Sequence, residues 1–372
     1  MSILQLSPLQ KRNLNKIVGI ALFWSLFGMT YALLERGILG NATVYPSTGN
    51  PYKFSTALLT ASFGALLMGF IFGGIEVYYL SRKFVRMAFG VKILLKTSIY
   101  LLVICLLVLL LSILGSSLSL QVAPNDTAVY NSVLLFMANE AFWCVAFYSG
   151  AVICVGLFLT EVSDNLGQGV VKNFLFGKYH RPREERRIFM FLDMKASTTI
   201  AEQLGHIRYF ELLNAYYADM TKSILNSAGI VYKYVGDEII ISWDYKTGLK
   251  NSNCLHCFFS IKNVLKDRAE NYKSRFGLAP AFKAGMHCGP VTTGEIGVLK
   301  KEIAFNGDVL NTTARIQSLC NDYGAELLVS EDLYTALHPD NSFAAKPIGN
   351  LRLRGRDARV NLYSVSQPSD YT

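Results

Sequence analysis

The run Arg187-Ile-Phe-Met-Phe-Leu-Asp193 is the stretch around which the fold of this chain can be inferred. A continuous apolar run that ends in an acid is typical of a strand buried on both faces of a sheet. Further along, Ile230–Val235 and Glu238–Trp243 flank a Gly-Asp turn, which predicts a β-hairpin. The region Arg187–Trp243 is therefore expected to form a strand, two helices and a hairpin, with one carboxylate near each strand end.

The two carboxylates, Asp193 and Asp237, come together if the hairpin lies beside the first strand. Two close carboxylates repel each other, and the pKa of each rises unless a cation lies between them. A hard divalent ion with oxygen ligands, shared with substrate phosphates, is the simplest compensating cation. Directly after Asp193, Ser197 and Thr198 supply hydroxyls and backbone N–H groups at a helix start. This combination predicts a phosphate cradle next to a metal site.

The second half of the chain continues to alternate strands and helices. The expected elements are a helix (Leu255–Phe276), a strand (Pro280–His287), a Gly-Pro turn, a strand (Val291–Val298), a helix (Val309–Leu319), a strand (Glu326–Val329), a short helix from Glu331, and strands near Phe343–Leu353 and Val360–Val365. This order predicts an α+β domain with helices on one face of a mainly antiparallel sheet.

Two further groups of polar residues suggest chemistry. Asn311 and Arg315 lie four residues apart in an expected helix, so they project from the same face. An amide and a fixed cation there suit a ribose and the charge that develops on a phosphoryl group; a solvated helix face is the alternative. Asn306-Gly-Asp308 can cap this helix. Arg354 and Arg356 could clamp phosphates or belong to an ordinary edge strand.

The first half of the chain has the composition of a membrane unit. Of 372 residues, 51% are hydrophobic. The charge-free runs are Ile17–Leu34, Phe54–Ile75, Thr97–Asn125 and Ala141–Thr160. A helix of roughly 20 apolar residues crosses a bilayer, so each run can span it. The third helix is expected to end near Leu114, before Gly115-Ser-Ser. No comparable run follows Thr160.

Basic residues set the expected orientation. They cluster before the first run (Lys11, Arg12, Lys16), between the second and third (Arg82, Lys83, Arg86, Lys92, Lys96) and after the fourth (Lys172, Lys178, Arg181, Arg183). The positive-inside rule therefore places both termini and the second half in the cytoplasm of a multi-pass protein of the plasma or inner membrane. This bias and anionic lipid account for the net charge of +9, so no nucleic-acid partner is inferred.

Acids and thiols outside these patterns have competing interpretations. Glu140 is expected about two turns inside the outer face, where an ionised carboxylate is costly. A sensing or ion-linked group and a carboxylate hydrogen-bonded to a neighbouring helix both fit it, whereas Glu76 lies near an inner helix end and can snorkel. Cys254-Leu-His-Cys257 has zinc-like spacing, but no second pair follows, so thiols of a helix are favoured.

The chain is thus divided into residues 1–160 (four-helix transmembrane domain), 161–186 (cytoplasmic linker) and 187–368 (second domain). The linker contains Gly167 and Gly169 before a basic, Pro-containing segment. If Thr160–Val171 stays helical, the fourth span is rigidly coupled to the next domain. If the glycines break the helix, the joint is a swivel.

Five motifs of the second half resemble the class III nucleotidyl cyclases, the family of adenylate and guanylate cyclases. They are Phe191-Leu-Asp-Met-Lys-Ala-Ser-Thr198, Lys233-Tyr-Val-Gly-Asp237, Gly285-Met-His-Cys-Gly-Pro-Val291, Gly307-Asp-Val-Leu-Asn-Thr-Thr-Ala-Arg315 and Arg354-Gly-Arg356. The resemblance covers roughly Ile188 to Val365, in family order and spacing. It implies a ferredoxin-like α+β catalytic domain behind a four-helix transmembrane module.

The resemblance also implies roles for the acids. Asp193 and Asp237, with the Met194 carbonyl, would hold two Mg²⁺ or Mn²⁺ ions per site. The ribose 3′-oxygen would attack the α-phosphorus of ATP, and pyrophosphate would leave. The product would be 3′,5′-cyclic AMP, which makes the chain a membrane-bound adenylate cyclase.

Family sites lie between two cyclase domains, and the second domain would supply the remaining groups. Asn311 would orient the ribose, Arg315 would stabilise the transition state, and Arg354 would hold terminal phosphate oxygens. Lys233 matches the lysine that reads adenine in adenylate cyclases, whereas its partner position holds Ala304, which cannot accept a hydrogen bond from the adenine amino group. Because this chain has both sets but one domain, a head-to-tail homodimer with two symmetric sites is expected.

Other functions remain open at this stage. A guanylate cyclase is one alternative, because Ala304 cannot read the adenine amino group. Gly236-Asp-Glu238 mimics part of a diguanylate cyclase hairpin, although Val235 and Ile239 depart from that signature. A catalytically silent membrane receptor that keeps the cyclase fold is the third alternative; the intact acids and the Asn/Arg helix argue against it.

Overall fold

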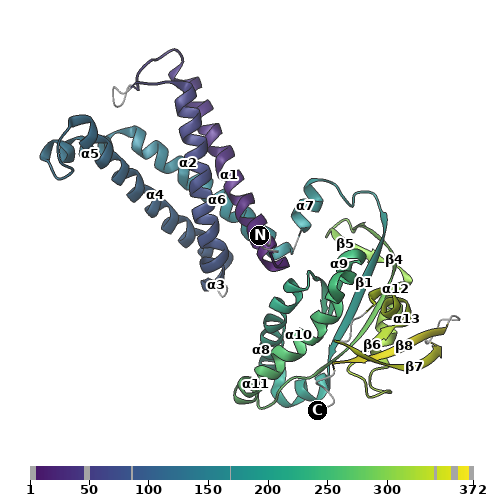
Figure 1. Cartoon of the computed structure of the whole chain (residues 1–372). Helices are drawn as coiled ribbons and strands as arrows, with labels where there is room; N and C mark the ends of the chain where they lie inside the picture. Colours follow the sequence, from purple (N-terminus) through teal and green to yellow (C-terminus); the bar gives the residue numbers. More distant parts are fainter. Residues whose placement is uncertain are drawn as a thin grey trace. The chain divides into compact units, whose positions relative to one another are not determined.

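The computed structural model describes residues 6–45, 51–84, 87–167, 169–338, 342–352 and 359–367. The chain forms two compact units, one of Gln10–Gly167 and one that contains Gln168–Thr372 (Figure 1). We call them the membrane unit and the sheet unit.

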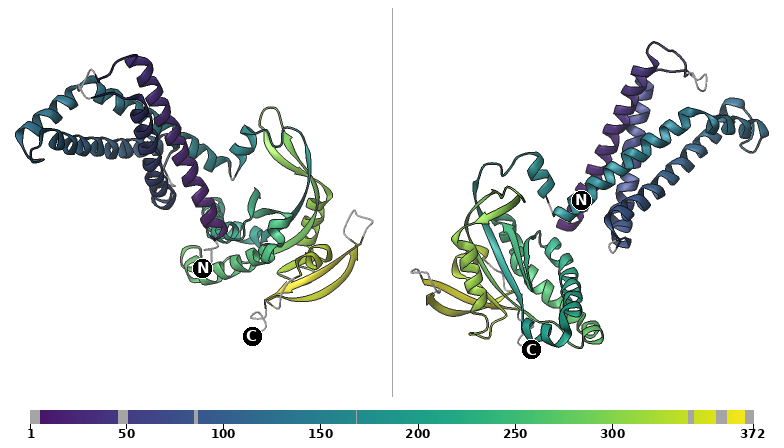
Figure 2. Two further views of the ribbon diagram at one scale, coloured as in Figure 1. Left: turned by 45° about the horizontal axis from the view of Figure 1, so that its top comes forward. Right: turned by 180° about the vertical axis from the view of Figure 1, so that it is seen from behind.

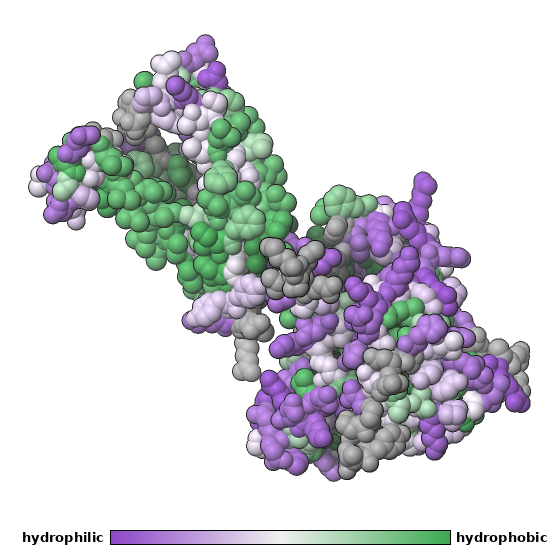
Figure 3. Space-filling view, viewed as in Figure 1, coloured by the Kyte–Doolittle hydropathy of each residue, from purple (hydrophilic) through white to green (hydrophobic). Residues whose placement is uncertain are grey.

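The membrane unit consists of helices with apolar surfaces. Its elements are α1 (Pro8–Leu39), α2 (Phe54–Ile75), the π-helical turn η1 (Glu76–Leu80), α3 (Ser81–Lys83), α4 (Phe89–Leu120), α5 (Thr127–Ala138) and α6 (Glu140–Leu166). In the part of the chain that the structure describes, four segments are long and apolar enough to cross a membrane: α1, α2 with η1, α4 and most of α6. Hydrophobic side chains cover the outside of these helices, in contrast to the polar surface of the sheet unit (Figure 3). Outward-facing apolar side chains suit a bilayer as solvent.

Three expectations for the membrane unit are wrong. Glu76 does not snorkel, because it is 4% exposed and pairs with Lys96 of α4. Helix α4 continues past Leu114 and Gly115 to Leu120 and ends where Gln121 turns left-handed (φ 57°). A glycine inside a helix costs only about 1 kcal/mol, which the flanking leucines tolerate. Glu140 begins α6, exposed, outside the apolar segment Phe142–Leu166, because Asn139 is extended and separates α5 from α6. It is therefore not two turns inside the span.

The joint after α6 contains a helix break. Helix α6 ends at Leu166, and Gly167 and Gly169 have φ of 96° and 75°. Helix α7 (Val170–Leu175) follows. The left-handed backbone of both glycines ends the helix, so the fourth span does not continue as one helix through Val171.

The described residues of the sheet unit form eight strands. They are β1 (Arg183–Met194), β2 (Ile230–Val235), β3 (Glu238–Asp244), β4 (Phe282–Ile296), β5 (Glu302–Asn306), β6 (Leu327–Ser330), β7 (Ala344–Arg352) and β8 (Arg359–Ser366). The strand order is β2-β3-β1-β4-β6-β8-β7, with β5 also paired to β4. All pairs are antiparallel except β4 with β6. The sheet is mainly antiparallel, as predicted.

Helices cover both faces of this sheet, which corrects the prediction of one face (Figures 1 and 2). The remaining elements are α8 (Ser197–Asn226), α9 (Tyr245–Leu249), η2 (Lys250–Ser252), α10 (Asn253–Asp267), α11 (Ala269–Phe276), α12 (Asp308–Ser318) and α13 (Glu331–Leu337). Ile188, Met190 and Leu192 of β1 join the main core with α8 and α10. Phe189 and Phe191 point the other way and pack with Val309 of α12.

The expected Gly-Pro turn is also wrong, because Gly289 and Pro290 lie inside the continuous strand β4. On the side of β4 away from β1, pairing with β6 ends at Met286 and pairing with β5 begins at Thr292. Pro290 falls in the gap, where a missing N–H group costs no ladder hydrogen bond. The strand β5 was not anticipated.

The cysteines of the sheet unit belong to its core. Cys254 and Cys257 on α10 are both 0% exposed, and Cys288 and Cys320 are also buried. Burial raises the pKa of the Cys254 thiol to about 12. Among the described residues, no three His, Cys, Asp or Glu side chains form a group that could hold a metal. Cys254 and Cys257 are therefore core thiols, as favoured from the sequence.

Candidate active site

The structure brings Asp193 and Asp237 together at one end of the β1–β3 pair. In the register, Leu192 lies opposite Ile239, so Asp193 sits beside the turn that opens β3. Gly236 in that turn has φ of 64°, a conformation that favours glycine. The Asp193 and Asp237 carboxyl groups are close enough to share a hydrogen bond.

The ionised pair is electrostatically unfavourable even with a lysine beside it, because the pKa of Asp193 is raised. Burial, followed by the hydrogen bond to Asp237 and its negative charge, raises the pKa of Asp193. Among the described residues, Asp237 Oδ2 is buried and has no hydrogen-bond partner. A buried carboxylate oxygen without a donor is costly. Both observations fit a site that is completed by a cation.

Two residues at this site were not anticipated. Lys283 lies opposite Asp193 in the β1–β4 register, with its Nζ 3.4 Å from Asp193 Oδ2. Gln317 Nε2, on α12, donates a hydrogen bond to the same oxygen at 3.0 Å. Lys283 could have been noticed, because it is the one charge in the apolar strand Pro280–His287. Gln317 gives no comparable local signal.

A third acid, Glu238, borders the pair. Burial, then the charges of Asp193 and Asp237, raises the pKa of Glu238 to about 7. Since no metal-binding group of three such side chains is found among the described residues, Glu238 is a neighbour of the pair and not a third ligand in this structure.

The start of α8 follows the pair directly. Ala196 is left-handed (φ 55°) and gives the helix no side-chain cap. Ser197 hydrogen-bonds Tyr209, while Thr198 is exposed, and Met194 ends β1 with its side chain buried. The first N–H groups of a helix have no intrahelical acceptor, so this uncapped end is available to an anion.

Asn311 and Arg315 lie on α12, the helix whose Gln317 contacts Asp193. Asn311 is exposed and Arg315 half-buried, and in the described part of the chain neither side chain contacts Asp193 or Asp237. The predicted cap by Asn306-Gly-Asp308 is wrong: Gly307 holds the N-cap position, without a side-chain cap. A Cβ at Gly307 would lie 2.9 Å from the Pro290 carbonyl oxygen, which explains the glycine.

Lys233 and Ala304 lie on strands near one another. Tyr232 Oη, next to Lys233 on β2, accepts a hydrogen bond from the Phe305 N–H of β5 at 3.3 Å. Ala304 is paired with Gly294. A hydrogen bond from Lys300 and its charge, then the charge of Lys233, lower the pKa of Glu302. Arg354 and Arg356 lie outside the described residues.

Comparison with known proteins identifies the family. The family described as "Adenylate and Guanylate cyclase catalytic domain" matches residues 180–367, about half of the chain. The chain belongs to this family. Its sheet unit is therefore called the cyclase unit below.

The cyclase unit has curated relatives. The chain is 33% identical over 213 residues to "Adenylate cyclase 2" of Rhizobium meliloti (strain 1021), covering 57% of this chain and 59% of that protein. It is 28% identical over 187 residues to "Adenylate cyclase" of Anabaena cylindrica, covering 48% of this chain and 36% of that protein. The matched region thus spans less than two thirds of either relative.

Among solved structures, the chain resembles "Structure of a bacterial light-regulated adenylyl cyclase" with a TM-score of 0.51 and 20% identity. The match covers 59% of this chain and 64% of that chain. It supports the α+β fold of the cyclase unit.

The donor set of the cyclase unit suits a hard divalent cation. Asp193 and Asp237 offer carboxylate oxygens, one of them without a donor, and Mg²⁺ is usually bound by one or two carboxylates together with substrate phosphates. Lys283 already neutralises part of the negative charge. The residues present therefore fit a metal held jointly with a phosphate substrate.

Proposed function

We propose that this chain is a membrane-anchored adenylate cyclase that converts ATP into 3′,5′-cyclic AMP and pyrophosphate. The observation that carries the proposal is the close pair Asp193–Asp237, with a buried oxygen that has no donor among the described residues. The likeness to two proteins named adenylate cyclases supports the choice of reaction.

In this proposal the acid pair binds two Mg²⁺ or Mn²⁺ ions. Asp193, Asp237 and the Met194 carbonyl would hold them at the end of β1. When bound, such ions lower the pKa of the ribose 3′-hydroxyl and neutralise the triphosphate.

The neighbouring cations and N–H groups bind the triphosphate. Lys283 would turn from Asp193 toward phosphate oxygens once Asp193 is engaged, while Ser197 and Thr198 at the start of α8 receive a further phosphate. The 3′-oxygen loses its proton to solvent and forms a bond to the α-phosphorus. The bond from that phosphorus to the pyrophosphate oxygen breaks, and pyrophosphate carries away the electron pair.

Two copies of the chain complete each site. Among the described residues no hydrogen bond or ion pair joins Asn311 or Arg315 to the acid pair of their own chain, so they would serve the acids of a second copy. Large apolar side chains stand exposed on α8 and β2: Ile207, Phe210, Tyr234 and Val235 are 51–78% exposed. Exposed apolar patches mark association surfaces. They support a twofold homodimer in which Asn311 orients the ribose and Arg315 stabilises the transition state.

Base selection would rest on β2 and β5. Lys233 would recognise adenine by donating a hydrogen bond to a ring nitrogen. The side chain of Ala304 offers no acceptor for the adenine amino group. The carboxylate on the same strand is that of Glu302, whose pKa the charge of Lys233 lowers. ATP is the proposed substrate, and GTP the competitor that a weak base pocket would admit.

The four apolar helices would anchor the enzyme in the plasma or inner membrane. The distribution of basic residues favours cytoplasmic termini and a cytoplasmic cyclase unit.

The direct test is an assay of the purified full-length protein with ATP or GTP and with Mg²⁺ or Mn²⁺. Cyclic AMP should form only with a divalent ion, and Asp237→Ala should abolish it while the protein still expresses. Faster turnover of GTP would make the chain a guanylate cyclase. No cyclic nucleotide under any condition, or full activity of Asp237→Ala, would overturn the proposal.

A further inference from the structure

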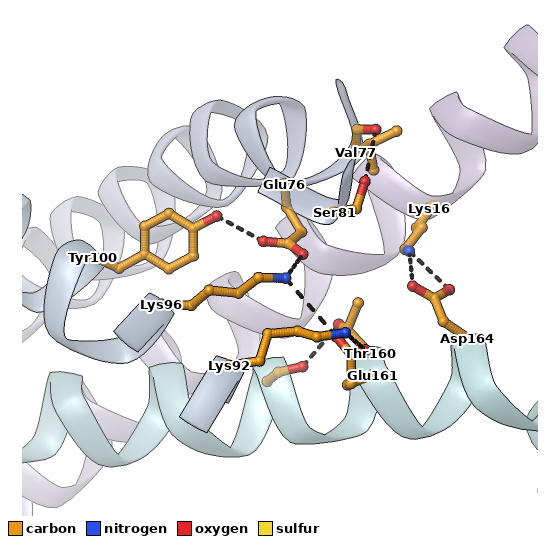
Figure 4. Close-up of polar contacts among 11 residues, drawn as sticks. Lys16, Glu76, Val77, Ser81, Lys92, Lys96, Tyr100, Thr160, Glu161 and Asp164 are labelled. Carbon is orange, nitrogen blue, oxygen red and sulfur yellow. Dashed lines mark hydrogen bonds and ion pairs between the residues drawn. The ribbon is translucent and has the colours of Figure 1, made fainter. Parts of the chain in front are cut away.

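A network of buried charges joins helices of the membrane unit (Figure 4). Glu76, the first residue of η1, is 4% exposed, and Lys96 on α4 is 1% exposed. Lys96 Nζ lies 2.5 Å from Glu76 Oε1, and Tyr100 Oη donates a hydrogen bond to Glu76 Oε2 at 2.9 Å. This pair lies at the end of α2 and near the start of α4.

Lys96 also faces a second carboxylate. Its Nζ lies 3.9 Å from Glu161 Oε2, near the end of α6. Glu161 Oε1 in turn accepts a hydrogen bond from Lys92, one turn before Lys96 on α4. Two carboxylates and two ammonium groups therefore form one balanced chain from η1 through α4 to α6. We call Glu76, Lys92, Lys96, Tyr100 and Glu161 the inner network.

A more exposed ion pair lies beside this network. Lys16 Nζ of α1 is 2.6 Å from Asp164 Oδ2 of α6, and these side chains are 24% and 39% exposed. It also contacts α6 within one turn of Glu161, but it does not bridge two carboxylates. The peripheral pair therefore provides a matched reference for the inner network.

A simple anchor has no need of the inner network. A buried ion pair stabilises a fold no more than well-packed apolar side chains of similar volume. Ionisable groups within membrane helices are expensive and by default indicate function. Moreover, Glu76 sits on a π-helical turn, a rare conformation that is frequent at functional sites. These features favour a role in conformational change.

We propose that the inner network makes the membrane unit a regulatory input to the cyclase unit. Lys96 divides its attraction between Glu76 and Glu161. A displacement of η1 from α4 removes the first partner and draws Lys96 toward Glu161, which shifts the end of α6. That helix leads within one residue to Gly167 and on to the cyclase unit. A test of this inference by cyclase activity rests on the proposed function.

Charge reversal distinguishes a network that transmits movement from η1 to α6 from one that only holds η1 and α4 together, which we call a clamp. The double variant Glu76→Lys/Lys96→Glu restores opposite charges between η1 and α4 but places a carboxylate next to Glu161. In membranes that contain the full chain, it should insert at the wild-type level. Its cyclase activity should change by about threefold or more, because mutations along a coupled network shift coupling on this order. A clamp would instead recover wild-type activity.

Further variants complete the test. Adding Lys92→Glu and Glu161→Lys restores every ion pair of the network with reversed signs, and activity should return to within about twofold of wild type. The control Lys16→Asp/Asp164→Lys should leave activity unchanged, because a partly exposed pair contributes at most about 1 kcal/mol. Should the double variant fail to insert, Glu76→Gln/Lys96→Gln removes the pull on Glu161 without leaving an unpaired charge, and the same change in activity is expected.

The trypsin cleavage rate after Lys178, an exposed residue between α7 and β1, gives a readout that needs no catalysis. It should change in the double variant and recover in the fourfold variant. Wild-type activity and wild-type cleavage in the inserted double variant, or an equal effect of the control pair, would overturn the inference. A wild-type chain without cyclase activity but with these cleavage differences would refute the proposed function alone.

Discussion

At the scale of single residues, the acid pair that would bind a divalent ion lowers the stability of the folded protein in the absence of that ion. The folded-state pKa of Asp193 lies above its unfolded value, so at neutral pH its ionised form destabilises the fold. Asp193→Asn removes this charge and should raise the Tm of the metal-free full-length protein in detergent by about 1–4 °C. It should abolish activity and the stabilisation by Mn²⁺. A lower Tm in EDTA would contradict this account.

The contribution of Glu238 to stability depends on pH. Its pKa is about 7 in the folded state, against an ordinary value of 4.5 for a free glutamate side chain, so the folded protein binds the proton more tightly. The stabilising contribution is complete below pH 4.5 and is lost as the pH rises through 7. Between about pH 5 and 8 the free energy of unfolding of the wild type should fall by about 1–3 kcal/mol, once screening by solvent is included. In Glu238→Gln the free energy of unfolding should change less over the same pH range. Parallel curves for the two proteins would refute this.

At the scale of elements, the approach of α12 to β4 positions the site. A Cβ at Gly285 would lie 2.4 Å from the backbone nitrogen of Gln317, the residue that holds Asp193. Gly285→Ala must push α12 outward and should destabilise the cyclase unit by about 1–3 kcal/mol. Gly294→Ala, on the same strand, meets only ordinary contacts of 3.4–3.5 Å with Pro182 and serves as control. Equal melting of both variants would contradict this packing.

The same elements show how far the sequence could predict the structure. Strand β1, the β2–β3 hairpin and the acid pair followed from apolar runs and a Gly-Asp turn, which are local signals. The path of β4 through Pro290 did not, because it depends on which neighbouring strand ends where. The contact of Gln317 with Asp193 depends on the tertiary approach of α12. Likewise, Glu140 was misplaced because the break at Asn139 has no strong sequence signal.

At the scale of the whole molecule, the proposed enzyme works as a pair of chains. Asp193→Ala and Arg315→Ala chains should each be inactive, since each lacks one group in both sites of its homodimer. Coexpression should restore about a quarter to a half of the activity per heterodimer, because one of its two sites is intact. Copurification through two different tags checks that heterodimers form. No rescue in copurified heterodimers would exclude a site shared between chains.

The buried cysteines of the cyclase unit have a practical consequence. Thiolates, not thiols, react with alkylating agents, and burial both hides these four sulfurs and keeps Cys254 protonated. Modification therefore requires the core to open. The rate at which a maleimide modifies these four thiols therefore measures how often the fold opens transiently. This measurement does not depend on which product the enzyme makes.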